Sequence, residues 1–234
     1  ELITIAPEVD QTWNKQMTSS KTVSIDAKGD GPFTLMFSWS MNHDNYGGTL
    51  MKMGDIEYGL DATSMKPYLK IGDKTYWSQN LLGTSDAWAT QSSGTDGKWY
   101  LTKLGVWNAT FSYDGKTLTI YREGWIDQKF DIEGLTLDNI KIGGFDGTLV
   151  SGKVYKAALQ QVDIRAAISA GLLEAVTLPT ETYSDIILPT SIGGKNLIWT
   201  SSNPEVISAT GEIFYPKEVT EVTMTVCIGD QTKD

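Results

Sequence analysis

Hydrophobic and polar residues alternate along residues 107–113, which read WNATFSY. The apolar side chains fall on one face and the polar ones on the other, because successive side chains of a strand point in opposite directions. Asp114 and Gly115 predict a two-residue type I′ turn with positive φ at both positions, and residues 117–122 then return as a β-branched and aromatic strand. With a second turn predicted at Glu123–Gly124, the stretch is interpreted as a half-buried antiparallel meander.

Short β-branched and aromatic runs separated by turn residues recur throughout the first two thirds of the chain. Strands are predicted at residues 21–25, 33–41, 49–52, 56–60, 68–71, 98–101, 106–113, 117–122, 128–132, 140–142 and 148–155. This many short strands at such spacing predicts two packed antiparallel sheets. The predicted fold class is therefore all-β, with an antiparallel jelly-roll β-sandwich as its main part.

The pattern changes after residue 155. Residues 157–173 hold spaced apolar positions without proline, which predicts one or two helical turns acting as a connector. From Val176 onward the chain carries four of its seven prolines between short β-branched runs, which predicts a second, smaller β-domain. The predicted organisation is a jelly roll at 1–165, a linker at 166–175 and a small domain at 176–234.

Charge narrows the range of partners. The formal net charge is −10 at pH 7, with a pI near 4.6, so phosphate backbones and anionic lipid headgroups would be repelled. Nucleic acids and membranes are therefore not predicted partners, and a neutral ligand such as a glycan suits the surface better. The chain opens ELITIAPE, with neither Met nor a signal peptide, so we expect a processed chain or an excised fragment.

The order of strands and turns over residues 107–164 resembles the C-terminal half of the laminin-G-like or concanavalin-A-like jelly rolls. That half often shows a tryptophan strand, a DG turn, a strand ending in tyrosine, spaced glycines and a last strand leading to a short helix. In this chain the pattern falls on Trp107, Asp114, Gly115, Tyr121, Gly124, Gly143, Gly147 and Tyr155. The resemblance implies the jelly-roll fold but does not identify a ligand.

The second segment resembles the small, atrophied bacterial immunoglobulin-like domains of secreted glycoside hydrolases, notably family 43 arabinanases and xylosidases. The matching stretches are YSDIILPT at 183–190 and IWTSSNPEVIS at 198–208, followed by Gly211 and Pro216. Such domains end with a further strand, whereas this chain stops at Asp234. We therefore expect an immunoglobulin-like domain truncated at its C-terminus, in part of a longer secreted or cell-surface bacterial enzyme.

Catalytic machinery is not visible in the sequence. Family 16 glucanases use an E-x-D-x-x-E run on one strand face, and this chain has none. Asp55 with Glu57, and Asp131 with Glu133, lack a third acid, so solvated strand edges are favoured over catalytic pairs. His43 is the only histidine, which excludes zinc sites with several imidazoles. This region is predicted to be noncatalytic, within a parent protein that is a glycoside hydrolase.

Glycan binding needs flat aromatic faces for sugar rings and polar side chains for hydroxyl groups, and three predicted loops offer both. The candidate ligand-binding residues are His43, Asp44 and Tyr46 in the first loop, Tyr76, Trp77 and Trp88 in the second, and Arg122 and Trp125 at a hairpin. Trp39, Trp107 and Trp199 lie in apolar strands and are predicted to belong to the core.

Calcium is the one metal that the resemblance suggests. Laminin-G-like sandwiches often hold it at a rim through acids and backbone carbonyls, and the corresponding position is Asp146 in GGFDG. A simple turn aspartate is the alternative interpretation. No other cofactor is predicted.

The favoured function is noncatalytic binding of a polysaccharide, such as arabinan, xylan or fructan, as an accessory region of a glycoside hydrolase. The expected partners are that glycan and a catalytic domain in the same polypeptide. Two alternatives remain open. The sandwich could complete or support a neighbouring glycoside hydrolase active site, or it could be a structural or adhesive spacer without a sugar site.

Overall fold

The computed structural model describes residues 5–41, 47–62, 66–78, 90–91, 99–100, 106–192 and 195–234. The chain divides into two compact units, Glu1–Ile164 and Arg165–Asp234. Strands dominate the first unit, the second has five short strands, and α1 (Gln161–Glu174) is the helix among the described residues. The all-β class is confirmed, although α1 is longer than the one or two turns predicted for the connector. No helix in the described ranges is long and apolar enough to cross a membrane.

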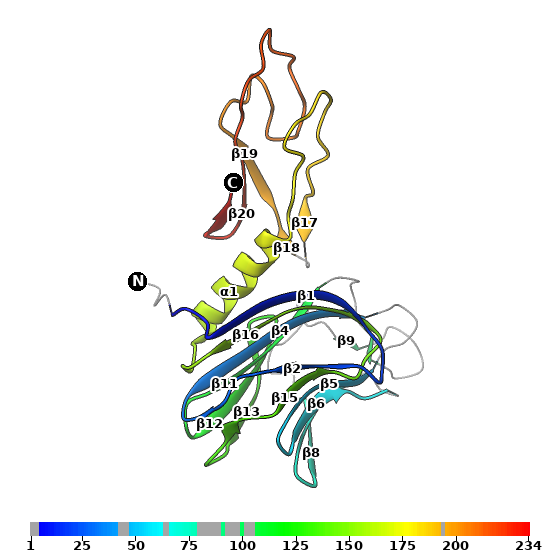
Figure 1. The fold of residues 1–234 in the computed structure, drawn as a ribbon, viewed down its shortest axis with the longest axis vertical. Helices are drawn as coiled ribbons and strands as arrows, with labels where there is room; N and C mark the ends of the chain where they lie inside the picture. Colours follow the sequence, from blue (N-terminus) through cyan, green and yellow to red (C-terminus); the bar gives the residue numbers. More distant parts are fainter. Residues whose placement is uncertain are drawn as a thin grey trace. The chain divides into compact units, whose positions relative to one another are not determined.

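The first unit consists of two six-stranded antiparallel sheets that face each other (Figure 1). The first sheet has the order β1-β16-β4-β11-β12-β13, formed by β1 (Val9–Met17), β16 (Gly147–Tyr155), β4 (Phe33–Met41), β11 (Trp107–Tyr113), β12 (Thr117–Arg122) and β13 (Trp125–Asp131). The second sheet has the order β2-β15-β5-β6-β7-β8, formed by β2 (Thr22–Ile25), β15 (Ile140–Gly143), β5 (Gly48–Met53), β6 (Ile56–Leu60), β7 (Pro67–Ile71) and β8 (Lys74–Trp77).

Two further pairs of short strands accompany these sheets. They are β3 (Gly29–Asp30) with β14 (Thr136–Leu137), and β9 (Thr90–Gln91) with β10 (Trp99–Tyr100).

Inward-facing side chains of the two sheets form one hydrophobic core, which includes Trp39 and Trp107 as predicted. The meander prediction was wrong in one respect, because every residue of β11 is buried, on both faces of the strand. Its outer face is covered in part by the segment that follows β16. There the Ser112 Oγ donates a hydrogen bond to the Leu159 carbonyl at 3.0 Å, and the Thr34 Oγ1 donates one to the Ala157 carbonyl at 2.7 Å.

The two predicted turns of the meander differ in the structure. Glu123 and Gly124 both have positive φ, 52° and 77°, as a type I′ turn requires. In the first turn only Gly115 does, so the type I′ prediction was wrong there. The Asp114 carboxylate instead accepts hydrogen bonds from the backbone N–H groups of Lys116 and Thr117, and these bonds lower the pKa of Asp114.

The second unit begins within α1, and a small β-structure follows the helix. It contains β17 (Ser191–Ile192) paired with β18 (Lys195–Asn196), and a three-stranded sheet of β19 (Ile198–Ser201), β20 (Met224–Ile228) and β21 (Gln231–Lys233). Trp199 is buried, and its Nε1 donates a hydrogen bond to the Pro189 carbonyl at 2.8 Å. This indole therefore fills the small core, as the sequence predicted.

Candidate functional site

Two adjacent cross-strand rows of side chains lie on the outer face of the second sheet. The first row runs over β15, β5, β6 and β7 and consists of Lys141, Lys52, Glu57 and Lys70. The second row runs over β5, β6, β7 and β8 and consists of Thr49, Gly59, Tyr68 and Trp77. The rows are two residues apart on β6 and β7, about 7 Å, because the residue between them faces the core. On β5 they are three residues apart, because the register shifts between Thr49 and Met51. We call these two rows the outer platform.

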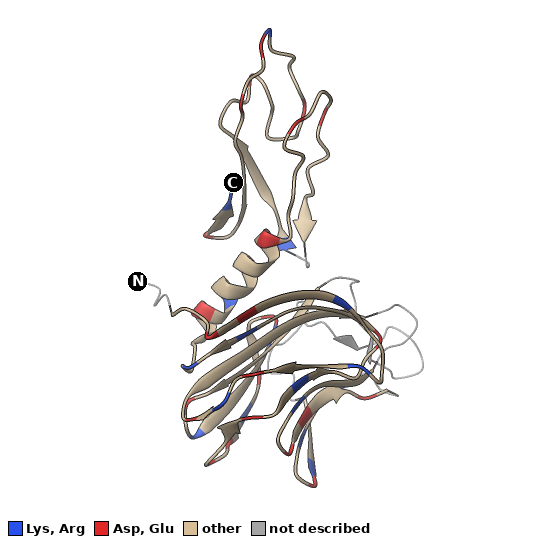
Figure 2. Ribbon diagram, viewed as in Figure 1, with Lys and Arg blue, Asp and Glu red and all other residues tan. Residues whose placement is uncertain are grey.

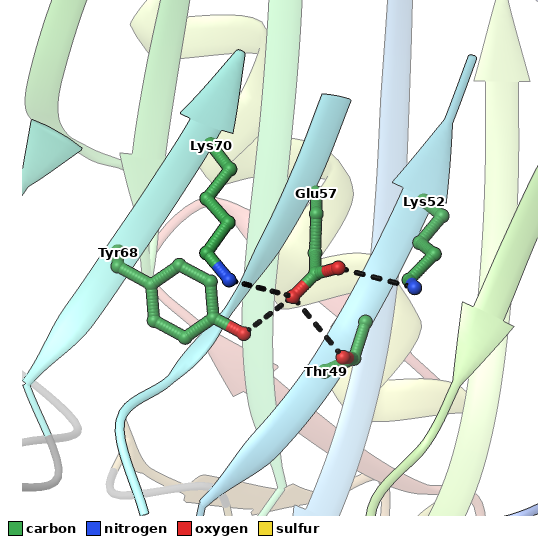
Figure 3. A network of polar contacts seen from close by, with 5 residues as sticks. All are labelled: Thr49, Lys52, Glu57, Tyr68 and Lys70. Carbon is green, nitrogen blue, oxygen red and sulfur yellow. Dashed lines mark hydrogen bonds and ion pairs between the residues drawn. The ribbon is translucent and has the colours of Figure 1, made fainter. Parts of the chain in front are cut away.

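Glu57 is the centre of the polar contacts in the outer platform (Figure 3). Its Oε2 lies 3.1 Å from Lys52 Nζ and its Oε1 lies 3.9 Å from Lys70 Nζ. The Tyr68 hydroxyl donates a hydrogen bond to Oε1 at 2.7 Å, and the Thr49 hydroxyl donates one at 3.4 Å. Four side chains from the two flanking strands, β5 and β7, thus converge on one carboxylate of β6.

These contacts shift the pKa values of the Glu57 carboxyl and the Tyr68 hydroxyl. Burial alone would raise the pKa of the Glu57 carboxyl, but the Tyr68 hydrogen bond and the two ammonium groups outweigh it, so that pKa lies below its ordinary value of 4.5. Partial burial and the hydrogen bond to Glu57 raise the pKa of Tyr68. Near neutral pH, Glu57 is therefore a carboxylate and Tyr68 a neutral donor.

Replacing Glu57 by glutamine should make the stability of the first unit less dependent on acid pH. Because the pKa is lowered in the folded state, the carboxylate contributes stability above its ordinary value of 4.5, and that contribution disappears as the pH falls through the folded value. Denaturant unfolding of both proteins from about pH 6 to about pH 3 checks this. The difference in free energy of unfolding between the wild type and Glu57→Gln should shrink as the pH falls. A difference that stays constant over this range would contradict a stabilising role of the ionised Glu57.

The aromatic part of the outer platform is Trp77 with Tyr68. Trp77 is 45% exposed, and its ring meets the ring of Tyr68 edge to face, with centroids 6.0 Å apart. Position 59 must be glycine for this arrangement, because a Cβ there would lie 2.8 Å from the Tyr68 hydroxyl oxygen and 2.5 Å from the Gly48 carbonyl oxygen. The missing side chain lets the Tyr68 phenol reach across the sheet to Glu57.

The predicted binding loops leave from one end of the first unit. In the second sheet, Gly48, Leu60 and Pro67 are in register at this end. Ser78 follows Trp77, and its hydroxyl donates a hydrogen bond to Asp127 Oδ1 at 2.7 Å, which joins the end of β8 to the start of β13. His43, Asp44, Tyr46 and Trp88 lie outside the described residues.

The other predicted ligand-binding residues lie apart from the outer platform. Arg122 is fully buried, with its Nη2 3.0 Å from Oδ1 of the equally buried Asp127. Tyr76 packs edge to face on Phe130, with ring centroids 4.9 Å apart, beside the core. Trp125 is partly buried at the start of β13. Trp77 is thus the predicted residue that the structure places in the outer platform, and ligand contact by the others stays a prediction.

Asp146 lies between β15 and β16, and its Oδ1 accepts a hydrogen bond from the Ser19 backbone N–H at 3.1 Å. Within the described ranges, no group of three or more His, Cys, Asp and Glu side chains is placed to hold a metal ion. Calcium binding at Asp146 stays a prediction.

No protein-family model and no curated protein sequence matches the chain. Among solved structures, the CBM40 of the Ruminococcus gnavus IT-sialidase is 10% identical with a TM-score of 0.48, over 69% of this chain and 99% of that one. The leech intramolecular trans-sialidase is 14% identical with a TM-score of 0.48, over 80% and 30% of the two chains. A Trypanosoma rangeli sialidase is 14% identical with a TM-score of 0.40, over 58% and 22%. At these values the similarity supports no inference about activity or ligand.

Proposed function

We propose that the first unit is a noncatalytic module that binds a saccharide through the outer platform. The observation that carries this proposal is the exposed indole of Trp77, which stands beside Tyr68 and next to a row of hydrogen-bonding side chains. An aromatic face accepts the apolar face of a sugar ring, while carboxylate, ammonium and hydroxyl groups orient its hydroxyl groups. The outer platform supplies both on adjacent strands.

The same geometry disfavours hydrolysis at this face. Most glycosidase families use two carboxyl groups, one of which must carry a proton at the start of the reaction. The outer platform, whose residues are all described, has one carboxyl group, and the pKa of Glu57 is lowered by its contacts, which keeps it ionised. These features support a binding role.

The biological role that follows is an accessory one. A module that holds a polysaccharide raises the effective concentration of an attached enzyme at its substrate without new chemistry. We propose a catalytic domain in the same polypeptide, a secreted or cell-surface glycoside hydrolase, as the partner. The candidate polysaccharides remain arabinan, xylan and fructan.

Affinity electrophoresis of the intact chain tests the proposal. Gels that contain arabinan, xylan or fructan should retard the chain relative to gels without polysaccharide, and calorimetry with sialyllactose extends the panel to a soluble oligosaccharide. Absence of binding to these glycans and also to the charged polymers described below would contradict the proposal. Polysaccharide cleavage by a catalytic domain that requires this chain would then favour the role of completing an active site. Neither binding nor such cleavage would favour a spacer.

A further inference from the structure

The outer platform has a local charge opposite to that of the whole chain. The strand positions of the second sheet that face away from the core carry three lysines and one glutamate, which gives +2. The chain as a whole carries −10. Basic and acidic positions are both spread over the two units as a whole (Figure 2), so the excess of lysine is a property of this face. The outward strand positions of this sheet therefore carry a net positive charge on an acidic protein, although the carboxylates that act on Tyr68 itself are those of Glu57 and Asp61.

The arrangement of the lysines destabilises the folded protein when no ligand is bound. Lys141 and Lys52 are directly opposite each other on neighbouring strands, and like charges in such positions are destabilising. Glu57 compensates Lys52 at 3.1 Å. Within the described ranges, however, Lys141 has no carboxylate within 4.0 Å of its Nζ, and its side chain is exposed. An external anion would relieve this repulsion.

The lysines are also within reach of a sugar stacked on Trp77. Trp77 is opposite Tyr68, and Lys70 lies two residues further along the same strand, which makes it the diagonal neighbour of Trp77. Diagonal neighbours on one face are about 7–8 Å apart, a distance that long side chains bridge. Lys52 and Lys141 continue the same row over the next strands. A chain of sugars along this row would meet three ammonium groups.

We infer that the saccharide bound by the outer platform is anionic and carries carboxylate or sulfate groups. This inference rests on the proposed function. The aromatic pair holds the sugar ring, and the excess of lysines over glutamate selects charged chains over neutral ones of the same shape. Glu57 keeps Lys52 and Lys70 directed at the centre of the face without cancelling the positive charge of the row.

Matched polymers test the inference. Polygalacturonate is compared with its methyl-esterified form, which keeps the sugar chain but loses the charge, and dextran sulfate is compared with dextran. The intact chain should bind at least one charged polymer about tenfold more tightly than its neutral counterpart, and the preference should decrease as NaCl is added. The two pairs distinguish carboxylate from sulfate as the recognised group.

Variants locate the effect on the protein. Lys141→Glu should weaken binding to the charged polymer about tenfold, and Lys141→Ala should weaken it less. Lys129→Glu, which changes an exposed lysine on β13 of the first sheet, is the matched control and should change binding less than about twofold. Thermal unfolding of each variant confirms that it folds.

The outcomes separate this inference from the proposed function. Equal binding of charged and neutral polymers, lost in Trp77→Ala but unchanged in Lys141→Glu, would overturn the inference and leave the proposed function standing. Charge preference that responds equally to Lys141→Glu and Lys129→Glu would also overturn it, as nonspecific attraction. No binding to any polymer in either panel would overturn both.

Discussion

Replacing Asp127 by alanine should lower the free energy of unfolding of the first unit by about 3–5 kcal/mol. Asp127 and Arg122 are both 0% exposed, with 3.0 Å between Asp127 Oδ1 and Arg122 Nη2. The same Oδ1 accepts the hydrogen bond from Ser78 at 2.7 Å. Removal of the carboxylate takes the acidic partner from a guanidinium that stays charged inside the sandwich, which is why the expected effect is large.

Denaturant unfolding measures this effect against a matched surface pair. Asp10→Ala breaks the ion pair between Asp10 and Lys153, which are 3.1 Å apart but partly exposed, and should change the free energy of unfolding by less than about 1 kcal/mol. Asp127→Asn, which keeps the shape and a hydrogen-bonding oxygen, should fall between the two. If Asp127→Ala were no more destabilising than Asp10→Ala, the buried pair would not hold this part of the fold together.

The buried pair matters for the outer platform because of where it lies. Ser78 directly follows Trp77, so the hydrogen bond from Ser78 to Asp127 fixes the end of β8 against the first sheet. Burial and the charge of Asp127 also raise the pKa of Tyr58, a residue of β6 whose side chain lies in the core. The interior polar contacts thus support the strand that presents the exposed indole.

Strands with strong alternation or continuous apolar character could be predicted from sequence. The predicted bounds of 33–41, 56–60 and 117–122 are those of β4, β6 and β12. β1 was missed because most of its residues are polar and exposed. It is an edge strand whose register shifts between Thr12 and Lys15, so its place in the sheet depends on pairing with β16 rather than on a local pattern.

The outer platform could be predicted only in part. Trp77 was named from its polar surroundings, but Tyr68, Lys52 and Lys70 were missed, and Glu57 was interpreted as a solvated strand edge. Their convergence depends on cross-strand register, which the tight turns fix through positive φ at Gly54 and Gly72, 58° and 56°. If the three strands had been aligned as consecutive hairpins across those two turns, the sequence would have placed Lys52, Glu57, Tyr68 and Lys70 on the same face.

Arg122 shows the opposite difficulty. A charged residue beside a hairpin turn is expected to be exposed, yet Arg122 is buried. The register of β12 and β13 shifts between Ile120 and Tyr121, and Asp127 falls in the extra position on β13. This bulge brings the Asp127 carboxylate to the Arg122 guanidinium inside the sandwich. No local pattern in the sequence predicts the bulge.

The second large effect is expected at the outer platform itself. Trp77→Ala should weaken binding of the saccharide by about 30-fold or more, because an exposed indole that anchors a ligand contributes about 2 kcal/mol or more when truncated. The variant should fold normally, since Trp77 is 45% exposed and lies on β8, at the edge of the second sheet. A loss of stability as large as that expected for Asp127→Ala would instead make Trp77 a structural residue.

Calorimetric titration of the retained saccharide into the intact chain, into Trp77→Ala and into Tyr183→Ala tests the central claim most directly. Tyr183 is 86% exposed in the second unit, so its replacement controls for loss of an exposed aromatic ring elsewhere. We predict wild-type affinity for Tyr183→Ala and a loss of about 30-fold or more for Trp77→Ala. Wild-type affinity in Trp77→Ala would contradict binding at the outer platform.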